Sequence, residues 1–207
     1  LRADRQPEFT QIDVEASFVE PEDILQWMEG LVVELARVAG LEAPRPFLRL
    51  TWAEAMERYG SDRPDLRYAL EIRDWTGAAA GLELAVVQRE LVRGGRLRGL
   101  VLPGGARLSR REMEQVEAEA KAAGAPGLLW AKRAGEGLSG SLGKFLAPRQ
   151  ADAMGIGVGD LAAAAAGPDG VTSPALAAAR SAAVRALGLA PEREHAWLWV
   201  TDFPVFV

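Results

Sequence analysis

Hydrophobic and polar residues alternate from Phe9 to Ala16. Every second position, beginning at Phe9, carries Phe, Gln, Asp and Glu, whereas the positions between them carry Thr, Ile, Val and Ala. Because successive side chains of a strand point to opposite faces, this pattern predicts a strand with one apolar face and one carboxylate face. Unpaired carboxylates are costly to bury, so the second face must meet water, a cation or a polar ligand. On the pattern alone, an ordinary amphipathic strand with a solvated polar face explains these residues.

A helical period replaces the alternation after Glu20. Pro21 and the two acidic residues that follow it suit the first turn of a helix, and Gly40 is a plausible end. An apolar stripe at helical spacing runs between them and predicts that the helix packs as core on the back of a sheet. The stripe consists of Ile24, Leu25, Met28, Leu31, Val32, Leu35 and Val38.

The next segment predicts a short strand, a helix and a loop. The strand covers Phe47–Leu50 after a Pro-x-Pro pair. Thr51 is placed to cap the helix and Gly60 to end it. The polar stretch Ser61–Arg67 then reads as a loop.

From about Ala69 to Ala190 the chain is rich in alanine and glycine. Ser109 and Glu112 predict a capping box for a helix that ends near Ala123, and a second helix is predicted from Thr172 to Leu187. Strands and helices in this irregular order favour an α+β fold over a doubly wound sheet. The predicted strands are Leu82–Gln88, Leu97–Leu102, Gly127–Ala131 and Gly143–Leu146.

The amino-acid composition excludes several classes of function. The 207 residues are 49% hydrophobic and 26% charged, with a net charge of −5, so no overall basic footprint for nucleic acid exists. The absence of cysteine excludes disulfides and thiol nucleophiles, and His195 is the single histidine, which we interpret as a surface or strand-edge residue. No apolar run approaches the roughly 20 residues of a membrane span, so we expect no membrane partner and a cytoplasmic location.

Several weaker signals have ordinary explanations. Gly135–Gly140 fits G-x-G-x-x-G, but no clear helix opens at its third glycine, and Gly143-Lys144 matches a phosphate loop incompletely. Some basic side chains are candidates for RNA contact but are better explained as solvated surface. They are Arg107, Arg110, Arg111, Lys132 and Arg133.

The string from Leu1 to Phe18 resembles the second signature motif of class II aminoacyl-tRNA synthetases, in the form typical of bacterial aspartyl-tRNA synthetases. The block Glu54–Arg67, with its run Tyr-Gly-Ser-Asp-Arg-Pro-Asp-Leu-Arg, resembles a second sequence specific to that family. The resemblance implies an aspartate–tRNA ligase that uses ATP and Mg²⁺, acts on L-aspartate and tRNA(Asp), and forms a homodimer. Whether tRNA(Asn) is a further substrate stays open, because the anticodon is read outside this chain.

The resemblance also assigns residues. Gln6 matches the residue that contacts ATP, and Asp13 matches the carboxylate that receives the ammonium group of aspartate. Glu15 is a candidate magnesium ligand on the same face. Arg2, Asp4 and Arg5 match the loop that meets the acceptor end of tRNA.

The middle of the chain resembles the insertion domain of the same family, often called the GAD domain, through Gly137–Leu146 and Val158–Gly167. The family implies a strand at Leu161–Ala166, although its five alanines favour a helix by propensity, and we follow the family here. The end of the chain, from Ala196 to Pro204, resembles the return to the catalytic core. We therefore expect part of an antiparallel-sheet catalytic core at residues 1–68 and 192–207, interrupted by an α+β insertion at 69–191.

Two alternatives remain at this point. The chain begins without methionine inside a motif and ends on an apolar run, so we expect a piece of a longer ligase that is inactive by itself. A stand-alone GAD-type module, working alone or within a tRNA-dependent amidotransferase, is a second interpretation. A truncated paralogue that binds tRNA or a partner is a third.

Overall fold

The computed structural model describes residues 8–135 and 137–206, which fall into two compact units divided between Phe47 and Leu48. The first unit contains one helix, α1 (Pro21–Val38), which begins where the sequence predicted. The carboxylate of Asp23 accepts a hydrogen bond from the main-chain N–H of Glu20 at 2.9 Å, which satisfies one end of the helix. The chain after the helix returns to it through the buried carboxylate of Glu29.

Glu29 organises this first unit. Its Oε1 accepts a hydrogen bond from the N–H of Phe47 at 3.3 Å, and its Oε2 accepts one from Nε of Arg45, also at 3.3 Å. The predicted apolar stripe is not fully buried, since Leu35 is 54% exposed and Val38 is 79% exposed. The described part of this unit contains no sheet on which the stripe could pack.

The prediction of a strand at Phe9–Ala16 was wrong, because these residues form no regular secondary structure. This segment forms no ladder with any described residue. Its apolar side chains are exposed, with Phe9 at 72% and Ile12 at 69%. A strand needs a neighbour to satisfy its main-chain groups, and residues 8–47 offer none.

The second unit begins with a parallel pair of strands from distant parts of the sequence. β1 (Leu48–Thr51) pairs with β7 (Leu198–Thr201), so that Leu48 lies opposite Leu198. Helix α2 (Trp52–Tyr59) follows at once, capped by Thr51 as predicted and ended by Gly60 in the left-handed conformation. Residues 61–70 then contain no regular element, which agrees with the loop predicted at Ser61–Arg67.

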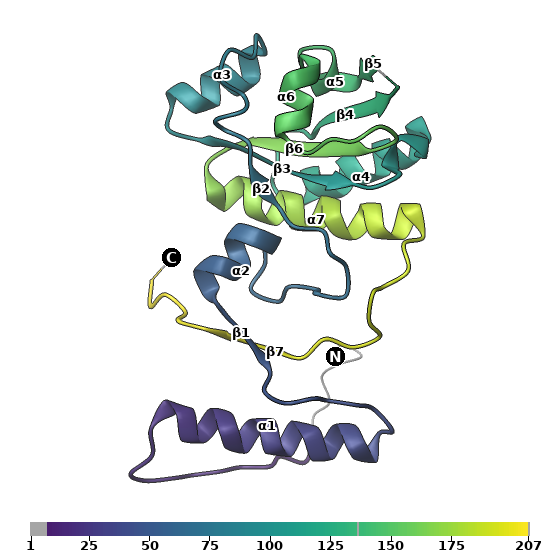
Figure 1. The fold of residues 1–207 in the computed structure, drawn as a ribbon. Helices are drawn as coiled ribbons and strands as arrows, with labels where there is room; N and C mark the ends of the chain where they lie inside the picture. Colours follow the sequence, from purple (N-terminus) through teal and green to yellow (C-terminus); the bar gives the residue numbers. More distant parts are fainter. Residues whose placement is uncertain (1–7, 136, 207) are drawn as a thin grey trace. The chain divides into compact units, whose positions relative to one another are not determined.

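An antiparallel five-stranded sheet in the order β2-β3-β6-β4-β5 forms the centre of this unit (Figure 1). Helices α4 (Arg110–Ala122) and α7 (Asp169–Leu187) cover one face. Helices α3 (Ala85–Val92), α5 (Gly140–Gly143) and α6 (Pro148–Ala153) cover the other. The strands are β2 (Arg73–Asp74), β3 (Arg96–Leu102), β4 (Leu129–Ala134), β5 (Gly137–Ser139) and β6 (Leu161–Gly167), and a short 3-10 turn, η1, spans Gly105–Arg107.

The alanine run at Leu161–Ala166 is the strand β6, and the family-based expectation is therefore confirmed. β6 pairs with β3 on one side and β4 on the other. Its side chains alternate between the two cores: Ala163 and Ala165 face α4 and α7, whereas Ala162 and Ala164 face the opposite layer. A central position with both faces covered outweighs the intrinsic helical preference of alanine.

Three predicted boundaries were wrong. Leu82–Gln88 is not a strand, because α3 places Val87 and Leu91 one helical turn apart on the core. Gly143–Leu146 is the end of α5 and a turn in which the N–H of Leu146 donates to the carbonyl of Gly143 at 3.2 Å. The predicted helix at Thr172 begins earlier, at Asp169, because the carbonyl of Pro168 already accepts the first helical hydrogen bonds.

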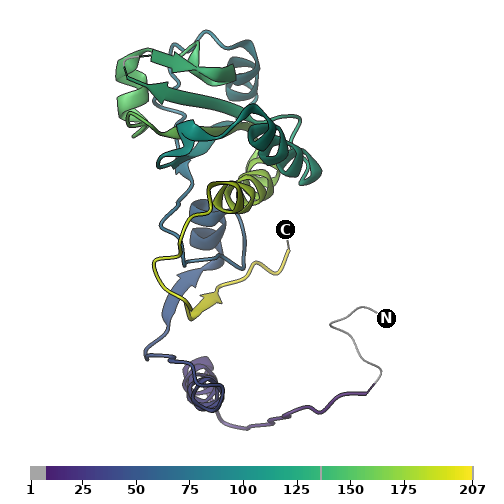
Figure 2. The same cartoon turned by 90° about the vertical axis from the view of Figure 1, so that its right-hand side faces the viewer.

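Helix α7 lies between the five-stranded sheet and α2, and Figure 2 shows it nearly end-on in that position. Gly60 makes this approach possible. A Cβ atom at Gly60 would lie 2.2 Å from the main-chain oxygen of Ser173 in α7. Only glycine therefore fits at the end of α2, both for its φ of +71° and for this contact.

We expect Gly60→Ala to lower the free energy of unfolding of unit 2 by about 3 kcal/mol, from left-handed strain plus overpacking. Gly188→Ala is the matched control, because Gly188 ends α7 with a φ of +59° and nothing lies within 4 Å of its Cβ position. The control should lose only about 1 kcal/mol. Urea unfolding of both variants measures the difference, and equal losses would exclude the contact with Ser173 as its cause.

Candidate functional site

The residues predicted for catalysis are only partly described. Gln6, Arg2, Asp4 and Arg5 lie outside the described residues. Asp13 and Glu15 are described and exposed, in the segment that pairs with no strand. They therefore do not form a closed site within this chain.

Metal ligation is equally incomplete. Among residues 8–135 and 137–206, no group of three His, Asp or Glu side chains is arranged to hold a metal ion. Glu15 remains a prediction as a magnesium ligand. No described helix is long and apolar enough to cross a membrane.

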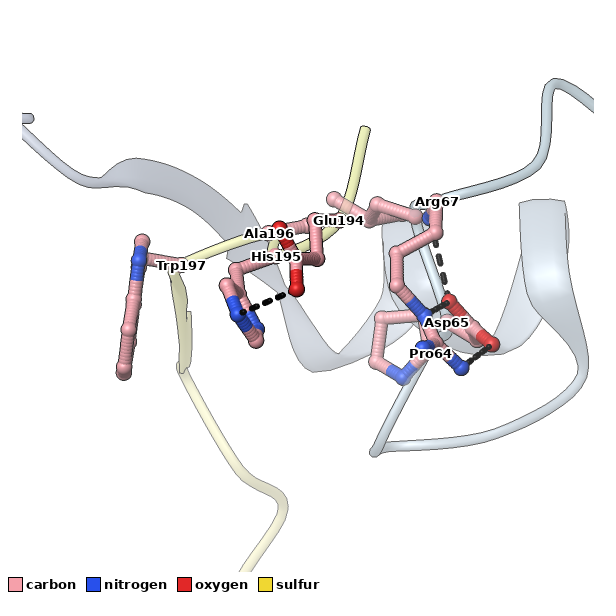
Figure 3. Close-up of a pocket in the computed structure, with 8 residues that line it drawn as sticks. Pro64, Asp65, Arg67, Glu194, His195, Ala196 and Trp197 are labelled. Atoms are coloured by element: carbon pink, nitrogen blue, oxygen red, sulfur yellow. Dashed lines mark hydrogen bonds and ion pairs between the residues drawn. The ribbon is translucent and has the colours of Figure 1, made fainter. Parts of the chain in front are cut away.

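A pocket of about 250 Å³ in the second unit joins two distant sequence segments (Figure 3). The loop from Pro64 to Arg67 forms one wall, and residues 194–197, just before β7, form the other. The main-chain N–H of Glu192 donates to the carbonyl of Arg67 at 2.8 Å and ties the two walls together. The loop belongs to the Glu54–Arg67 block noted in the sequence, whose family resemblance implies no individual roles.

An internal ion pair sets the charge of the loop wall. Arg67 grips both carboxylate oxygens of Asp65 at 2.9 Å, from Nε to Oδ1 and from Nη2 to Oδ2. This side-chain pairing lowers the pKa of Asp65 and raises that of Arg67. The acidic and basic side chains of this wall, Asp65 and Arg67, therefore neutralise each other.

The opposite wall carries the single histidine. His195 Nε2 lies 3.8 Å from a carboxylate oxygen of Glu194, and its side chain is 39% exposed, which agrees with the predicted surface position. The ring of Trp197 lies 6.3 Å from the His195 ring, centroid to centroid. No nucleophile is hydrogen-bonded to this histidine among the described residues, so the pocket can bind and position but offers no acyl-transfer triad.

Arg180, a buried residue of α7, holds the 61–70 loop through hydrogen bonds to its main chain. Arg180 is only 4% exposed, and its Nε donates to the carbonyl of Leu70 at 2.7 Å. Its Nη2 donates to the carbonyls of Asp65 at 2.6 Å and Tyr68 at 2.9 Å. Burial lowers the pKa of this guanidinium. One side chain thus satisfies three main-chain acceptors of a loop that has no secondary structure.

A second buried arginine holds α2. Arg98 of β3 is 1% exposed and donates through Nη2 to the carbonyls of Met56 and Glu57, at 3.1 and 2.5 Å. Its Nη1 donates to Ser173 Oγ of α7 at 2.6 Å. Sequence reasoning missed both arginines. The available signal was a lone basic residue within an otherwise apolar strand or helix.

Arg96, also in β3, pairs with three carboxylates. Arg96 bonds Glu57 at 2.6 Å and Asp169 at 2.8 Å through Nη2, and Asp74 at 3.1 Å through Nη1. The bond to Arg96 lowers the pKa of Glu57, and these partners raise the pKa of Arg96. The network joins α2, β2, β3 and α7.

The other basic residues noted as RNA candidates are mostly occupied. Arg107 donates to the carbonyl of Leu187 at 2.5 Å, and Lys132 donates to the carbonyl of Leu108. Arg133 pairs with Asp152 at 2.5 Å, and Arg110 pairs with Glu114 at 2.9 Å. These contacts favour structural and surface roles for them.

The profile of the class II tRNA synthetases (D, K and N) matches residues 1–207, and the chain belongs to that family. An aspartate–tRNA ligase of Shouchella clausii is 42% identical, and one of Geobacillus kaustophilus is 40% identical, each over 99% of this chain. An aspartate–tRNA(Asp/Asn) ligase of Chlamydia caviae is 37% identical over 100% of it. In each case the chain covers 36% of the length of the relative.

Acid should weaken the second unit in a defined window. The folded-state pKa values of Glu57 and Asp65 are lowered, so their stabilisation is complete above the ordinary values of 4.5 and 3.8. It is lost as pH falls below those values through the folded-state pKa. We expect urea midpoints to hold from neutral pH down to about 5 and then to fall.

Glu57→Gln should flatten this acid dependence, because the group that titrates has been removed. Glu83→Gln is the control, an exposed carboxyl with no ion pair among the described residues. An acid dependence identical in the wild type and Glu57→Gln would contradict a contribution from the Arg96 network.

Proposed function

We propose that this chain is the part of an aspartate–tRNA ligase that carries the amino-acid-binding strand and the insertion domain. The complete protein would join L-aspartate to ATP, release pyrophosphate, and transfer the aspartyl group from aspartyl-adenylate to the 3′ end of tRNA. The match of the family profile to the whole chain is the observation that carries this proposal. The names of the relatives, all of them aspartate–tRNA ligases, supply the substrate.

The front segment supplies the chemistry in this proposal. The carboxylate of Asp13 would receive the ammonium group of aspartate, a charge-assisted contact that also rejects uncharged analogues. The amide of Gln6 would donate to and accept from the nucleotide. Because the substrates react by in-line attack at phosphorus, holding both in one geometry supplies much of the rate.

Magnesium would be held by Glu15 together with nucleotide phosphates. This donor set fits the ion, because Mg²⁺ is commonly bound through one or two carboxylates plus substrate phosphates. The exposed carboxylates at 13 and 15 are free to face such a ligand. The ion would neutralise phosphate charge during attack.

The RNA partner follows from the same assignment. Arg2, Asp4 and Arg5 would meet the acceptor end of tRNA(Asp). The names of the relatives divide between Asp and Asp/Asn, so tRNA(Asn) is a second substrate to test. We further propose a homodimer in the cytoplasm, an insertion domain at residues 69–191, and no activity for this chain alone, since Asp13 and Glu15 stand exposed on an unpaired segment.

The alternative of an isolated binding module is less well supported. The five-stranded sheet has a core of its own on each face, as such a module would need. The match to the relatives, however, covers the residues before that sheet as well. A pure binding module has no use for the Gln6 and Asp13 positions.

Asp13→Ala in the complete protein should raise the KM for aspartate at least about 10-fold, because a charged contact is lost, and should leave the KM for ATP nearly unchanged. Aspartate-dependent ATP–pyrophosphate exchange measures both constants. Asp62→Ala, at an exposed carboxyl of the 61–70 loop, is the control. Equal effects of Asp13→Ala on both substrates would remove Asp13 from the aspartate site.

Arg5→Ala should reduce the rate of tRNA charging more than the rate of pyrophosphate exchange, because its proposed contact is made only with RNA. Arg149→Ala, at an exposed arginine of α6, is the control. A charging rate equal to that of the wild type would remove Arg5 from the acceptor contact.

A further inference from the structure

A second pocket, of about 240 Å³, is also lined by the loop that follows α2. Its lining includes the end of α2 at Tyr59, the loop residues Ser61 and Arg63, and Arg180 and Ser181 of α7. Two alanines, at 177 and 178, leave room at its α7 wall. The lining thus includes two arginines and three hydroxyl-bearing residues, of which Tyr59 donates its hydroxyl to Glu71.

Arg180 has no carboxylate counter-ion in this pocket, although its guanidinium lies 5.6 Å from the centre of the Tyr59 ring. No carboxylate of the described residues lies within 4 Å of its guanidinium, although the side chain is 4% exposed. Asp65 also lines the pocket, but Arg67 already neutralises it. Glu71, which accepts from Tyr59 at 3.3 Å, is likewise paired with Arg58 at 2.6 Å. A buried cation left unpaired is costly, and an anion bound beside it would offset that cost.

One nitrogen of Arg180 is also available. Its Nε and Nη2 serve the three loop carbonyls, whereas Nη1 has no hydrogen-bond partner among the described residues. Fully buried side-chain atoms that lack a partner are confined, among these residues, to Trp75, Arg98 and Thr172. Nη1 of Arg180 therefore keeps access to solvent.

Arg63 adds a second free cation. Its side chain is exposed and makes no ion pair with any described residue, in contrast to Arg58, Arg67 and Arg96. Its main-chain N–H donates to Ser61 Oγ at 3.1 Å, which orders the loop beneath it. Two guanidinium groups with neighbouring hydroxyls suit a tetrahedral anion with several acceptor oxygens.

We propose that the pocket between α2, the 61–65 loop and α7 binds a phosphate group of tRNA through Arg63 and Arg180. This proposal rests on the proposed function, which supplies the RNA. The contact would be to the backbone and would orient the RNA on the second unit without reading its sequence. A free phosphate could occupy the same groups, so the experiment separates the two sources.

Arg63→Gln in the complete protein is the decisive variant, because Arg63 is exposed and its loss leaves the fold intact. We expect tRNA(Asp) to bind about 3- to 10-fold more weakly. We also expect the slope of log K against log salt, measured between about 50 and 200 mM, to fall in magnitude by about 1. Arg149→Gln, an exposed arginine outside the pocket, should change neither quantity.

A second pair of variants tests the rim with a change of charge alone. Ser181 is exposed on α7, and Ser181→Asp and Ser181→Asn differ only in charge. The Asp variant should bind tRNA more weakly than the Asn variant yet unfold at a higher urea concentration, because it offers Arg180 a counter-ion. A residue with a purely structural role would not change stability and RNA binding in opposite directions.

The controls keep this proposal apart from the ligase assignment. Aspartate-dependent pyrophosphate exchange involves no RNA and should be unchanged in Arg63→Gln. If the wild type showed no such exchange, the assignment as a ligase would be contradicted, whereas the comparison of RNA binding would still be valid. Unchanged tRNA affinity and salt slope in Arg63→Gln would overturn the phosphate site. If inorganic phosphate then raised the Tm of the wild type but not of Arg63→Gln, the pocket would hold a free phosphate and not RNA.

Discussion

Two buried arginines hold the second unit together by donating to main-chain oxygens. Arg98 binds the last turn of α2, and Arg180 binds three carbonyls of the loop that follows it. Buried main-chain carbonyls need hydrogen-bond donors, and these two guanidinium groups supply them. The shapes of both pockets therefore depend on side chains that come from the central sheet and from α7.

The five-stranded sheet and the helices packed on it therefore support the 61–70 loop. Gly60 lets α2 approach α7, Arg96 gathers carboxylates from three elements, and Glu192 ties the chain before β7 to Arg67. The loop thus lines both pockets. Residues distant in sequence meet there because β1 and β7 pair in parallel.

The front segment shows the opposite case. Its alternating pattern predicts a strand, yet residues 9–16 form no strand in this structure. Alternation fixes which side chains share a face, but the ladder itself needs a neighbouring chain, and the described residues of the first unit contain none. The apolar stripe of α1 remains partly exposed for the same reason.

The sequence by itself determined the elements whose signals are local. The cap at Thr51, the capping box at Ser109 and the glycines at 60 and 188 placed two helix starts and two helix ends correctly, because caps act within one turn. The family resemblance was needed for the alanine strand β6, whose identity is set by its two neighbours. Only the tertiary structure decided that Arg98 and Arg180 are buried and which main-chain carbonyls they bind. These are properties of contacts between residues far apart in the chain, and no local pattern encodes which carbonyl or carboxylate a given arginine will meet.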